Sequence, residues 1–415
     1  MCAQPIAAIA AFACLGLLTS CAMSGQADKG GTEEAIRRCR MGTIRIQCRP
    51  GARVKVTQVA HEFWFGTAIS GRMFRDGADP AEKEKYLTIL KENFNAAVHE
   101  NALKWYSTER RQGETSYADA DRMLEWCEQN GIRMRGHCLF WAVDRYVQDW
   151  VKRLGADELR QAVESRAKEV TSRYRGRIVE YDVNNEMVHG NYYASRLGDE
   201  INVQMFKWAQ EGDPHAVLYV NDYSILSGRD LDAYEKQIKE LLAMGAPIGG
   251  IGAQGHFDAP IDVAQVKASL DRLAQFGLPI RVTEFDVNTD DEAKKAQFLG
   301  EFYRTCFAHP AVEGILMWGF WEGAHWRPKA ALWKKDFTPT PAALVYRDLV
   351  FHKWWTRWEG LADTHGVCEV PAFFGRHMVE VDGASREVVL RKAAGVVRLQ
   401  CTGSKPDTWS VVEGE

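Results

Sequence analysis

The sequence lacks the marks of several broad classes of protein. Of its 415 residues, 52 are Lys or Arg and 56 are Asp or Glu, and no basic run is longer than a few residues. Because nucleic-acid binding needs a concentrated basic patch, we expect no nucleic-acid partner. The cysteines show no Cys-x-x-Cys spacing, so a zinc site is not expected and we predict neither a metal nor another cofactor. No internal repeat or low-complexity tract is present.

The N-terminus carries an apolar run, Ile6–Leu18, that is too short to span a membrane and has the length of a signal peptide. It ends in Leu18-Thr-Ser-Cys21, which resembles the lipobox of bacterial lipoprotein precursors. We therefore expect residues 1–21 to be a signal peptide with its lipobox and Cys21 to be lipidated. The chain would then be an exported lipoprotein anchored at the bacterial cell envelope, with a periplasmic or secreted protein as the alternative. The small polar residues that follow predict a tether over residues 22–38.

Seven of the ten cysteines lie beyond this leader. An odd number in an exported chain leaves at least one free thiol, unless one of them bonds to another chain. Cys39 could pair with Cys48, or Cys368 with Cys401, and the sequence does not decide between these pairings and free thiols.

The composition favours a large globular core, since 46% of the residues are hydrophobic and 11% are aromatic. The count of 14 Trp is unusual. Indole faces stack well on sugars or bases, although most of these residues are expected to pack between helices and a sheet.

Short apolar runs alternate with helical patterns such as 119–129, 231–243 and 290–307 from about residue 61 onward. Eight strands alternating with helices predict an α/β fold, the closed parallel (β/α)8 barrel known as the TIM barrel. The eight predicted strands are 63–69, 95–98, 132–139, 178–183, 217–220, 250–253, 280–283 and 314–318.

Flanking segments with strand-like alternation lie on both sides of this region. Residues 41–48 and 52–59 alternate as a hairpin would around Arg49-Pro-Gly51, and strand patterns return after Trp358. We predict a β flank over residues 39–59, a catalytic barrel over 60–356 and a β-rich extension over 357–415. Together, the two flanks are expected to form one small β-rich layer against the barrel.

Polar or aromatic residues follow nearly every predicted strand. In a parallel barrel these strand ends converge on one face, which is where active sites lie. One polar residue at a strand end is usually a helix cap, but seven such ends in one chain indicate a functional site. The seven ends are 100–105, 136–137, 184–186, 221–223, 254–256, 284–286 and 318–321.

Two of these ends carry a glutamate, Glu186 after the fourth strand and Glu284 after the seventh. Hydrolysis of a glycosidic bond needs a pair of carboxyl groups, of which one protonates the leaving oxygen. The other carboxyl group attacks the anomeric carbon or activates water. Strand ends of a rigid barrel can hold such a pair at a fixed separation.

The segments 182–186 (Asp-Val-Asn-Asn-Glu) and 283–286 (Thr-Glu-Phe-Asp) resemble glycoside hydrolase family 10, whose members are mostly endo-β-1,4-xylanases. Further segments similar to that family occur in order between about residues 40 and 385; they are 101–105, 135–137 with Trp141, 221–223, 252–256, 318–319 and 326–327. The resemblance implies that Glu186 is the general acid/base and Glu284 the nucleophile of a retaining double displacement. Retention in turn predicts carboxyl groups about 5–5.5 Å apart.

The same resemblance implies a xylan or xylo-oligosaccharide site around this pair. Asn185 is expected to hold the sugar 2-hydroxyl, and His256 to donate to Glu284 while Asp286, unless it is a helix cap, orients His256. Tyr223 is expected to shape the leaving-group side, whereas Asn221 and Asp222 fit turn residues as well as ligands. The full set of expected substrate-binding residues is Glu100, Asn101, Lys104, His137, Trp141, Asn185, Tyr223, Gln254, His256, Trp318 and Trp326.

The third-strand motif departs from the family. Secreted microbial members continue Trp-His-Ser-Gln, whereas this chain reads Trp141-Ala-Val-Asp144. Residues 184–190, 318–322 and 374–381 resemble the plant-type branch instead. Retaining endo-β-1,4-xylanase activity is the leading interpretation; the same chemistry on another β-glycan or on short xylo-oligosaccharides, and a degenerate surface protein that only binds polysaccharide, are the alternatives.

Overall fold

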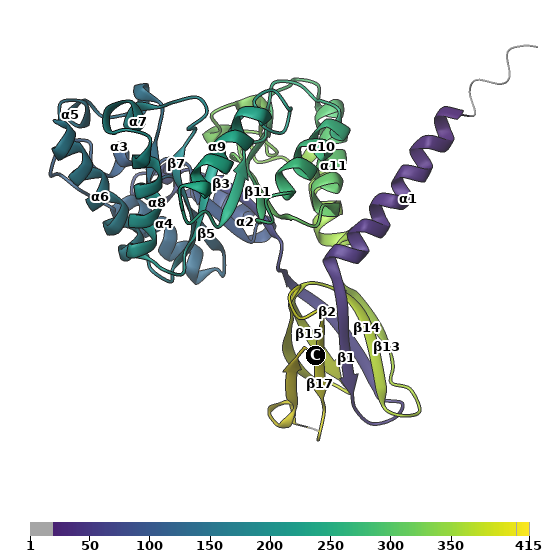
Figure 1. Ribbon diagram of the computed structural model, residues 1–415. Helices are drawn as coiled ribbons and strands as arrows, with labels where there is room; N and C mark the ends of the chain where they lie inside the picture. Colours follow the sequence, from purple (N-terminus) through teal and green to yellow (C-terminus); the bar gives the residue numbers. More distant parts are fainter. Residues whose placement is uncertain (1–19, 404, 415) are drawn as a thin grey trace, which may run out of the picture.

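The computed structural model describes residues 20–403 and 405–414, and its largest unit is a closed parallel β-barrel (Figure 1). Strand β12 pairs with β3, and β11 pairs with β9, so the hydrogen-bonded ring has no open edge. The eight barrel strands are β3 (Trp64–Ile69), β4 (Ala96–His99), β5 (Arg133–Gly136), β7 (Ile178–Asn185), β8 (Val217–Asp222), β9 (Gly250–Ala253), β11 (Ile280–Val287) and β12 (Val312–Met317). The predicted (β/α)8 barrel is thus confirmed, and each strand overlaps one of the eight predicted runs.

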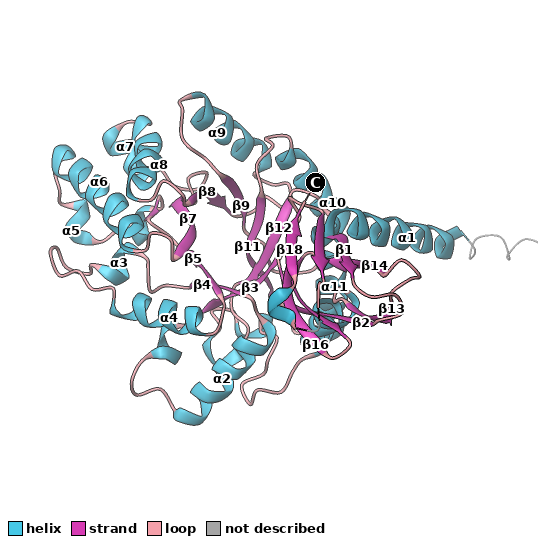
Figure 2. Ribbon diagram, turned by 90° about the horizontal axis from the view of Figure 1, so that it is seen from below, coloured by secondary structure: helices cyan, strands magenta, loops and turns pink. Residues whose placement is uncertain are grey.

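The barrel strands are covered on both sides, so their polar as well as their apolar residues are mostly buried. Every residue of β3 and β11 is buried, as expected where helices cover the outside and side chains fill the inside. Figure 2 shows these strands as a ring with helices around it. The helices are α2 (Pro80–Asn93), α3 (Trp105–Thr108), α4 (Ala118–Gln129), α5 (Asp149–Lys152), α6 (Ala156–Arg173), α7 (Tyr192–Leu197), α8 (Glu200–Gly212), α9 (Leu231–Ala243), α10 (Val263–Ala274), α11 (Glu292–Ala308) and α12 (Pro341–Asp348).

Short elements complete the loops at the strand ends. Two-residue strands β6 (Phe140–Trp141) and β10 (His256–Phe257) extend the sheet beyond β5 and β9. The single helical turns are η1 (Gly71–Phe74), η2 (Asp144–Tyr146), η3 (Glu322–Ala324), η4 (Pro328–Ala330), η5 (Leu349–Lys353) and η6 (Pro406–Thr408).

The flanking segments form two sheets, in the orders β14-β1-β17-β18 and β13-β2-β15-β16. Their inner faces share one apolar core that includes Ile46, Val56 and Val379. In Figure 1 this β-sandwich lies beside the barrel, with the N- and C-terminal segments interleaved. The strands are β1 (Met41–Gln47), β2 (Arg53–His61), β13 (Arg357–Leu361), β14 (Val367–Phe373), β15 (Gly375–Val381), β16 (Ala384–Leu390), β17 (Val396–Gln400) and β18 (Ser410–Glu413).

The predicted N-terminal hairpin is wrong, and the single β-layer is in fact two sheets. Strand β1 pairs with β14 and β17, whereas β2 pairs with β13 and β15, so β1 and β2 belong to different sheets on either side of the shared core. Alternating burial is the same for strands that pair side by side and strands that face across a sandwich. The pattern therefore could not distinguish the two arrangements. The predicted domain boundaries stay predictions.

The segment predicted as a tether lies in a helix, α1 (Ser20–Arg40). Its last turns pack on α11, where Ile36 is buried and Glu33 pairs with Arg304. The stretch Glu33-Glu-Ala-Ile-Arg-Arg-Cys-Arg40 consists mostly of good helix formers and ends in basic residues that favour a helix C-terminus. The tether prediction depended only on the small polar residues before this stretch. Residues 1–19 and the Cys21 side chain, on which the signal and lipidation predictions depend, lie outside the described part.

The seven cysteines from Cys39 to Cys401 are all free thiols in the described chain. Neither pairing left open by the sequence, Cys39 with Cys48 or Cys368 with Cys401, is formed. No helix among residues 20–403 and 405–414 combines the length and the apolar character that a membrane span requires.

Candidate active site

A cleft of about 780 Å³ opens at the carboxyl ends of the barrel strands. Both glutamates and all eleven predicted substrate-binding residues line it, and Asp286 lies directly beneath its wall. They come from strand ends far apart in the sequence, which the barrel brings to one face. The lining residues that the sequence did not single out include Tyr106, Arg145, Tyr146, Ser224, Ser227, Arg229 and Asp258.

Glu186 directly follows β7 and turns its carboxyl group into the cleft. Its φ of 61° lies in the left-handed region, which a non-glycine residue rarely adopts unless its surroundings hold it there. Trp141 Nε1 donates to Oε2 at 2.7 Å, and Gln254 Nε2 donates to Oε1 at 3.3 Å. Burial, and after it the carboxylate of Glu284, raises the pKa of Glu186 to about 7. This group is therefore largely protonated below about pH 7.

Glu284 lies on β11 and is surrounded by donors. Asn221 Nδ2 donates to Oε1 at 2.9 Å, and His256 Nε2 lies 3.1 Å from Oε2. His137 Nδ1 is 4.0 Å from Oε1. Only 4% of the residue is exposed, so these polar groups take the place of water around its carboxylate.

His256 is held as a cation by two carboxylates. Its Nδ1 lies 3.0 Å from Asp286 Oδ2, and its Nε2 faces Glu284. Burial disfavours the charged ring, but Asp286 and Glu284 outweigh burial and raise the pKa of His256 to about 9. Asp286 also accepts from Trp326 Nε1 at 2.7 Å. It is not a helix cap, because α11 begins at Glu292 and is capped by Asp291.

An amide network fixes Asn185 beside the two glutamates. Asn221 Nδ2 donates to Asn185 Oδ1 at 2.9 Å and to Glu284 Oε1, while Asn221 Oδ1 accepts from Thr283 at 2.7 Å. These bonds determine which way both amides point, and they leave the Nδ2 donors of Asn185 facing the cleft. Asn221 is therefore a part of the site that the sequence reading left undecided. Its strand-end position was the available signal.

Two neighbouring residues left open by the sequence have structural partners. Asp222 accepts from the Val188 N–H at 2.7 Å and from His189 at 2.6 Å, and so fixes the loop after Glu186. Asn184 donates to Asn202 at 3.0 Å and does not line the cleft.

One wall of the cleft combines charged, amide and aromatic groups. Lys104 Nζ donates to Asn101 Oδ1 at 3.1 Å and lies 4.4 Å from the centre of the Trp141 ring. Burial raises the pKa of Glu100 on the same wall. Trp318 is buried against His137, whereas 49% of Trp326 is exposed at the rim. Tyr223 stacks on His189, with ring centroids 3.6 Å apart.

Neither departure in the third-strand motif faces the cleft. Ala142 is buried, and its backbone bonds to Asn185 and Tyr192. Asp144 is exposed and pairs with Lys152 at 2.9 Å. Tyr146 stacks on Trp141, with ring centroids 3.5 Å apart. Tyr146 is therefore the polar aromatic side chain that the third-strand segment presents to the cleft.

A chain of buried ion pairs crosses the barrel interior toward Glu284. Arg281 Nη2 lies 2.7 Å from Glu180, and Arg135 bridges Glu180 at 2.6 Å and Asp182 at 2.5 Å. Asp182 in turn accepts from His137 Nδ1 at 2.9 Å. Although burial favours its neutral form, Arg135 and His137 hold the pKa of Asp182 below its usual range. The chain thus anchors His137 with Nδ1 as a donor. The role of Glu180 could not be predicted from the strand pattern, because any polar residue between apolar ones gives the same pattern.

Replacing Glu180 with glutamine is expected to lower the free energy of unfolding by about 3–5 kcal/mol, because Arg135 and Arg281 would share one buried carboxylate fewer. Glu128→Gln is the matched control: Glu128 pairs with Arg177 at 2.6 Å, but both side chains are 39% exposed. That exposed pair should contribute about 1 kcal/mol or less. Urea unfolding measures both variants, and equal losses would contradict the assignment of the interior chain as a stabilising network.

Among the described residues, no group of three or more His, Cys, Asp or Glu side chains is arranged to hold a metal ion. The chemistry of the cleft is that of one carboxyl group held protonated and a second carboxylate surrounded by donors.

Comparison with known proteins shows which family and which fold the chain is similar to. The family model described as "Glycosyl hydrolase family 10" matches residues 56–348. Endo-1,4-beta-xylanase 1 of Arabidopsis thaliana is 41% identical over 345 residues, which are 82% of this chain and 36% of the relative. Anti-sigma-I factor RsgI6 of Acetivibrio thermocellus is 39% identical over 331 residues, 80% of this chain and 42% of the relative. The chain thus spans less than half the length of these two relatives.

One solved structure has the same fold, and nearly all of its length aligns with this chain. The crystal structure of xylanase 10B from Thermotoga petrophila RKU-1 in complex with xylobiose aligns with a TM-score of 0.64 and 28% sequence identity. The alignment covers 70% of this chain and 95% of that protein.

Proposed function

The chain belongs to glycosyl hydrolase family 10, and from this premise we propose that it is a retaining endo-β-1,4-xylanase that hydrolyses internal bonds of xylan. The observation that carries the proposal is the pairing of Glu186 and Glu284 in one cleft. Burial and the neighbouring charge raise the pKa of Glu186 to about 7, while hydrogen-bond donors surround Glu284. One fold thus holds an acid and a nucleophile side by side.

In the proposed first step, Glu186 gives its proton to the glycosidic oxygen while Glu284 attacks the anomeric carbon. The bond to the leaving sugar breaks, and a covalent glycosyl ester forms on Glu284. Glu186, now a carboxylate, then takes a proton from water as that water displaces Glu284 from the anomeric carbon. Two inversions at one carbon retain its configuration.

The surrounding residues support binding and transition-state stabilisation. The Nδ2 donors of Asn185 suit the sugar 2-hydroxyl, a contact that strengthens as the oxocarbenium ion forms. The charged ring of His256 would orient the carboxylate of Glu284 before attack. Trp318 and Trp326 would pack against the sugar at the cleavage point, with Glu100, Asn101, Lys104 and His137 holding hydroxyl groups on the non-reducing side.

Xylan as the substrate class is supported by the relatives and by the shape of the cleft. The plant relative is named a xylanase, and the bacterial structure was solved with xylobiose. The cleft volume of about 780 Å³ and the exposed rim residue Trp326 suit a chain that enters along its length. An open cleft of this kind favours internal cleavage.

The rate is expected to fall on the alkaline side of neutrality. Glu186 must start protonated, and its pKa is about 7, so kcat/KM for xylan should fall about tenfold for each pH unit above 7. A pH profile of kcat/KM measures this limb. In Glu186→Gln the limb should vanish along with most of the activity, and an unchanged limb in that variant would assign it to another group.

A second candidate function rests on the relative named anti-sigma-I factor. A stretch this similar occurs in a protein named as an anti-sigma factor, so sequences of this kind are not limited to proteins named as xylanases. The second candidate is a protein that binds polysaccharide without cleaving it. The third candidate is the same retaining chemistry on another β-glycan or on short xylo-oligosaccharides.

Purified protein assayed on glucuronoxylan, arabinoxylan, mixed-linkage glucan and carboxymethylcellulose separates the three. New reducing ends from the two xylans are expected. New reducing ends from a glucan alone would support hydrolysis of another β-glycan. Binding to xylan without any new reducing ends would support a protein that binds polysaccharide without cleaving it.

We also propose export of the chain with a lipid anchor at Cys21, on the strength of the Leu18-Thr-Ser-Cys21 sequence. Metabolic labelling with a palmitate analogue in a bacterial host tests the anchor. An exported but unlabelled chain would leave a periplasmic or secreted protein.

A further inference from the structure

His189 is a partly buried histidine beside the cleft that the proposed reaction does not use. It lies in the loop after Glu186, and 20% of its side chain is exposed. Its two ring nitrogens face two carboxylates: Nδ1 lies 2.6 Å from Asp222 Oδ1, and Nε2 lies 3.3 Å from Asp230 Oδ2. A neutral imidazole has one N–H, whereas a protonated ring can donate to both carboxylates. A carboxylate at each nitrogen therefore fixes the plane of the ring.

The two carboxylates come from different elements and are themselves held in place. Asp222 ends β8, its side chain is fully buried, and it also accepts from the backbone N–H groups of Val188 and Tyr223, at 2.7 and 3.0 Å. Asp230 directly precedes α9. Burial disfavours a charge on His189, but the hydrogen bonds and charges of Asp222 and Asp230 outweigh burial and raise the pKa of His189 above its ordinary value. These contacts favour the ring as a cation.

The ring of Tyr223 packs on this histidine. The ring centroids are 3.6 Å apart and the ring planes are inclined by 15°, so the two rings lie face to face. A positively charged ring is attracted to the negative face of a phenol ring. Among the described residues, Tyr223 stacks on no other aromatic ring, and its hydroxyl group has no hydrogen-bond partner. His189 is thus the one aromatic contact in the described chain that orients the ring of Tyr223.

Tyr223 lies next to the proposed acid, on the side away from Lys104. It lines the cleft, and burial, followed by the charge of Glu186, raises the pKa of its hydroxyl group. The barrel strands follow one another in the order β4, β5, β7 and β8, so Glu186 after β7 lies between Lys104 after β4 and Tyr223 after β8. Lys104 is proposed to hold sugars on the non-reducing side. Tyr223 is therefore placed to contact the sugar on the leaving-group side.

We propose that His189 is a positioning residue that, held between Asp222 and Asp230, fixes the ring of Tyr223 as a platform for the leaving-group sugar. This inference rests on the proposed xylanase function. His189 covers one face of Tyr223, and the C–H groups of a sugar ring would pack on the other face. Because that contact is made in the bound substrate as well as in the transition state, its loss should raise KM more than it lowers kcat.

Two substrates with the same xylobiosyl group test the inference. The leaving group of xylotetraose is a sugar, whereas that of β-xylobiosyl fluoride is a single atom that cannot reach Tyr223. His189→Ala is expected to lower kcat/KM for xylotetraose about tenfold, mostly through a higher KM, and to leave kcat/KM for the fluoride within about twofold of wild type. A purely structural role would lower the fraction of folded protein, which reduces kcat on both substrates equally and leaves KM unchanged.

A double variant shows whether His189 acts through Tyr223. Tyr223→Ala should lower kcat/KM for xylotetraose at least as much as His189→Ala does. Adding His189→Ala to Tyr223→Ala should then change kcat/KM by no more than about twofold, because two residues that act through one contact are not additive.

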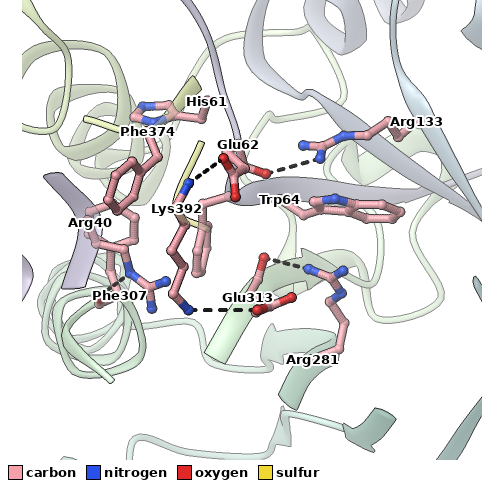
Figure 3. A pocket seen from close by; sticks show the side chains of 11 residues that line it. Arg40, His61, Glu62, Trp64, Arg133, Arg281, Phe307, Glu313, Phe374 and Lys392 are labelled. Atoms are coloured by element: carbon pink, nitrogen blue, oxygen red, sulfur yellow. Dashed lines mark hydrogen bonds and ion pairs between the residues drawn. The ribbon is translucent and has the colours of Figure 1, made fainter. Parts of the chain in front are cut away.

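His61→Ala is the matched control. His61 is a buried histidine whose ring nitrogens also have two partners, Gln58 Nε2 at 3.1 Å and the carbonyl oxygen of Val350 at 3.2 Å. It lines a cavity together with Trp64, the first residue of β3, and so lies at the end of the barrel opposite the cleft (Figure 3). KM for xylotetraose should therefore be the same in His61→Ala as in wild type.

A wild-type KM for xylotetraose in His189→Ala, an equal loss on both substrates, or additive losses in the double variant would overturn the inference. A wild-type chain that cleaves neither substrate would instead contradict the proposed function. Circular dichroism checks that each variant folds. If His189→Ala does not fold, His189→Gln takes its place, because an amide can still donate to Asp222 but provides no ring for Tyr223. The same rise in KM is expected there, and a wild-type KM would overturn the inference.

Discussion

Glu284→Ala is expected to lower kcat for xylan by about 10⁵–10⁶-fold, the size of loss that removal of a catalytic nucleophile produces in another hydrolase. The variant has no group that can form the glycosyl ester, and water alone must attack the anomeric carbon. The loss should be equally large for an aryl xylobioside with a good leaving group, because the nucleophile is needed whatever departs. Wild-type cleavage of that substrate would contradict the role of Glu284.

Two further measurements separate this effect from misfolding. Asp144→Ala changes a carboxylate beside the cleft that pairs with Lys152 and does not line it, so its activity should stay near wild type. The carboxylate of Glu284 raises the pKa of Glu186, so in Glu284→Gln the pKa of Glu186 should fall below its wild-type value of about 7. Titration of Glu186 by carboxyl-selective isotope labelling and NMR measures that shift.

Glu186→Ala is expected to lower kcat/KM for xylan by about 10²–10⁴-fold, the usual contribution of a general acid. The leaving sugar is a poor leaving group unless it is protonated. With 2,4-dinitrophenyl xylobioside the departing phenolate needs no proton, so formation of the glycosyl ester should continue at a rate near wild type. Its hydrolysis should be slow, because the general base is also missing.

Pre-steady-state measurement on the dinitrophenyl substrate distinguishes the two carboxyl groups. Glu186→Ala should give a burst of phenolate followed by slow turnover, whereas Glu284→Ala should give no burst. An equal loss in Glu186→Ala on both substrates would mean that Glu186 does not act as the acid.

Much of the barrel could be predicted because its strands are covered on both faces. Continuous apolar runs such as Val217–Val220, each ending in polar residues, leave few alternatives to a closed parallel sheet. The same pattern of apolar runs followed by polar residues predicted that Glu186 and Glu284 lie at strand ends that converge on one face of the barrel.

The features that the sequence did not predict share a physical cause. The local alternation of polar and apolar residues does not specify which distant segments pair. Strands β1 and β2 alternate like a hairpin, yet their partners β14 and β15 lie more than 300 residues away and place them in different sheets. Glu180 fitted an ordinary polar position in the strand pattern, because only closure of the barrel brings Arg281 to Glu180. Asn221 fitted a turn residue as well as a ligand, and only the fold places Glu284 and Asn185 on either side of its amide.

The most direct test of the central claim is the configuration of the sugar released by the wild-type chain. Proton NMR during hydrolysis of xylo-oligosaccharides should show the β-anomer of the new reducing end first, with the α-anomer appearing later by mutarotation, because Glu284 and then water each invert the carbon once. Initial release of the α-anomer, or the absence of new reducing ends from any xylan, would contradict the account.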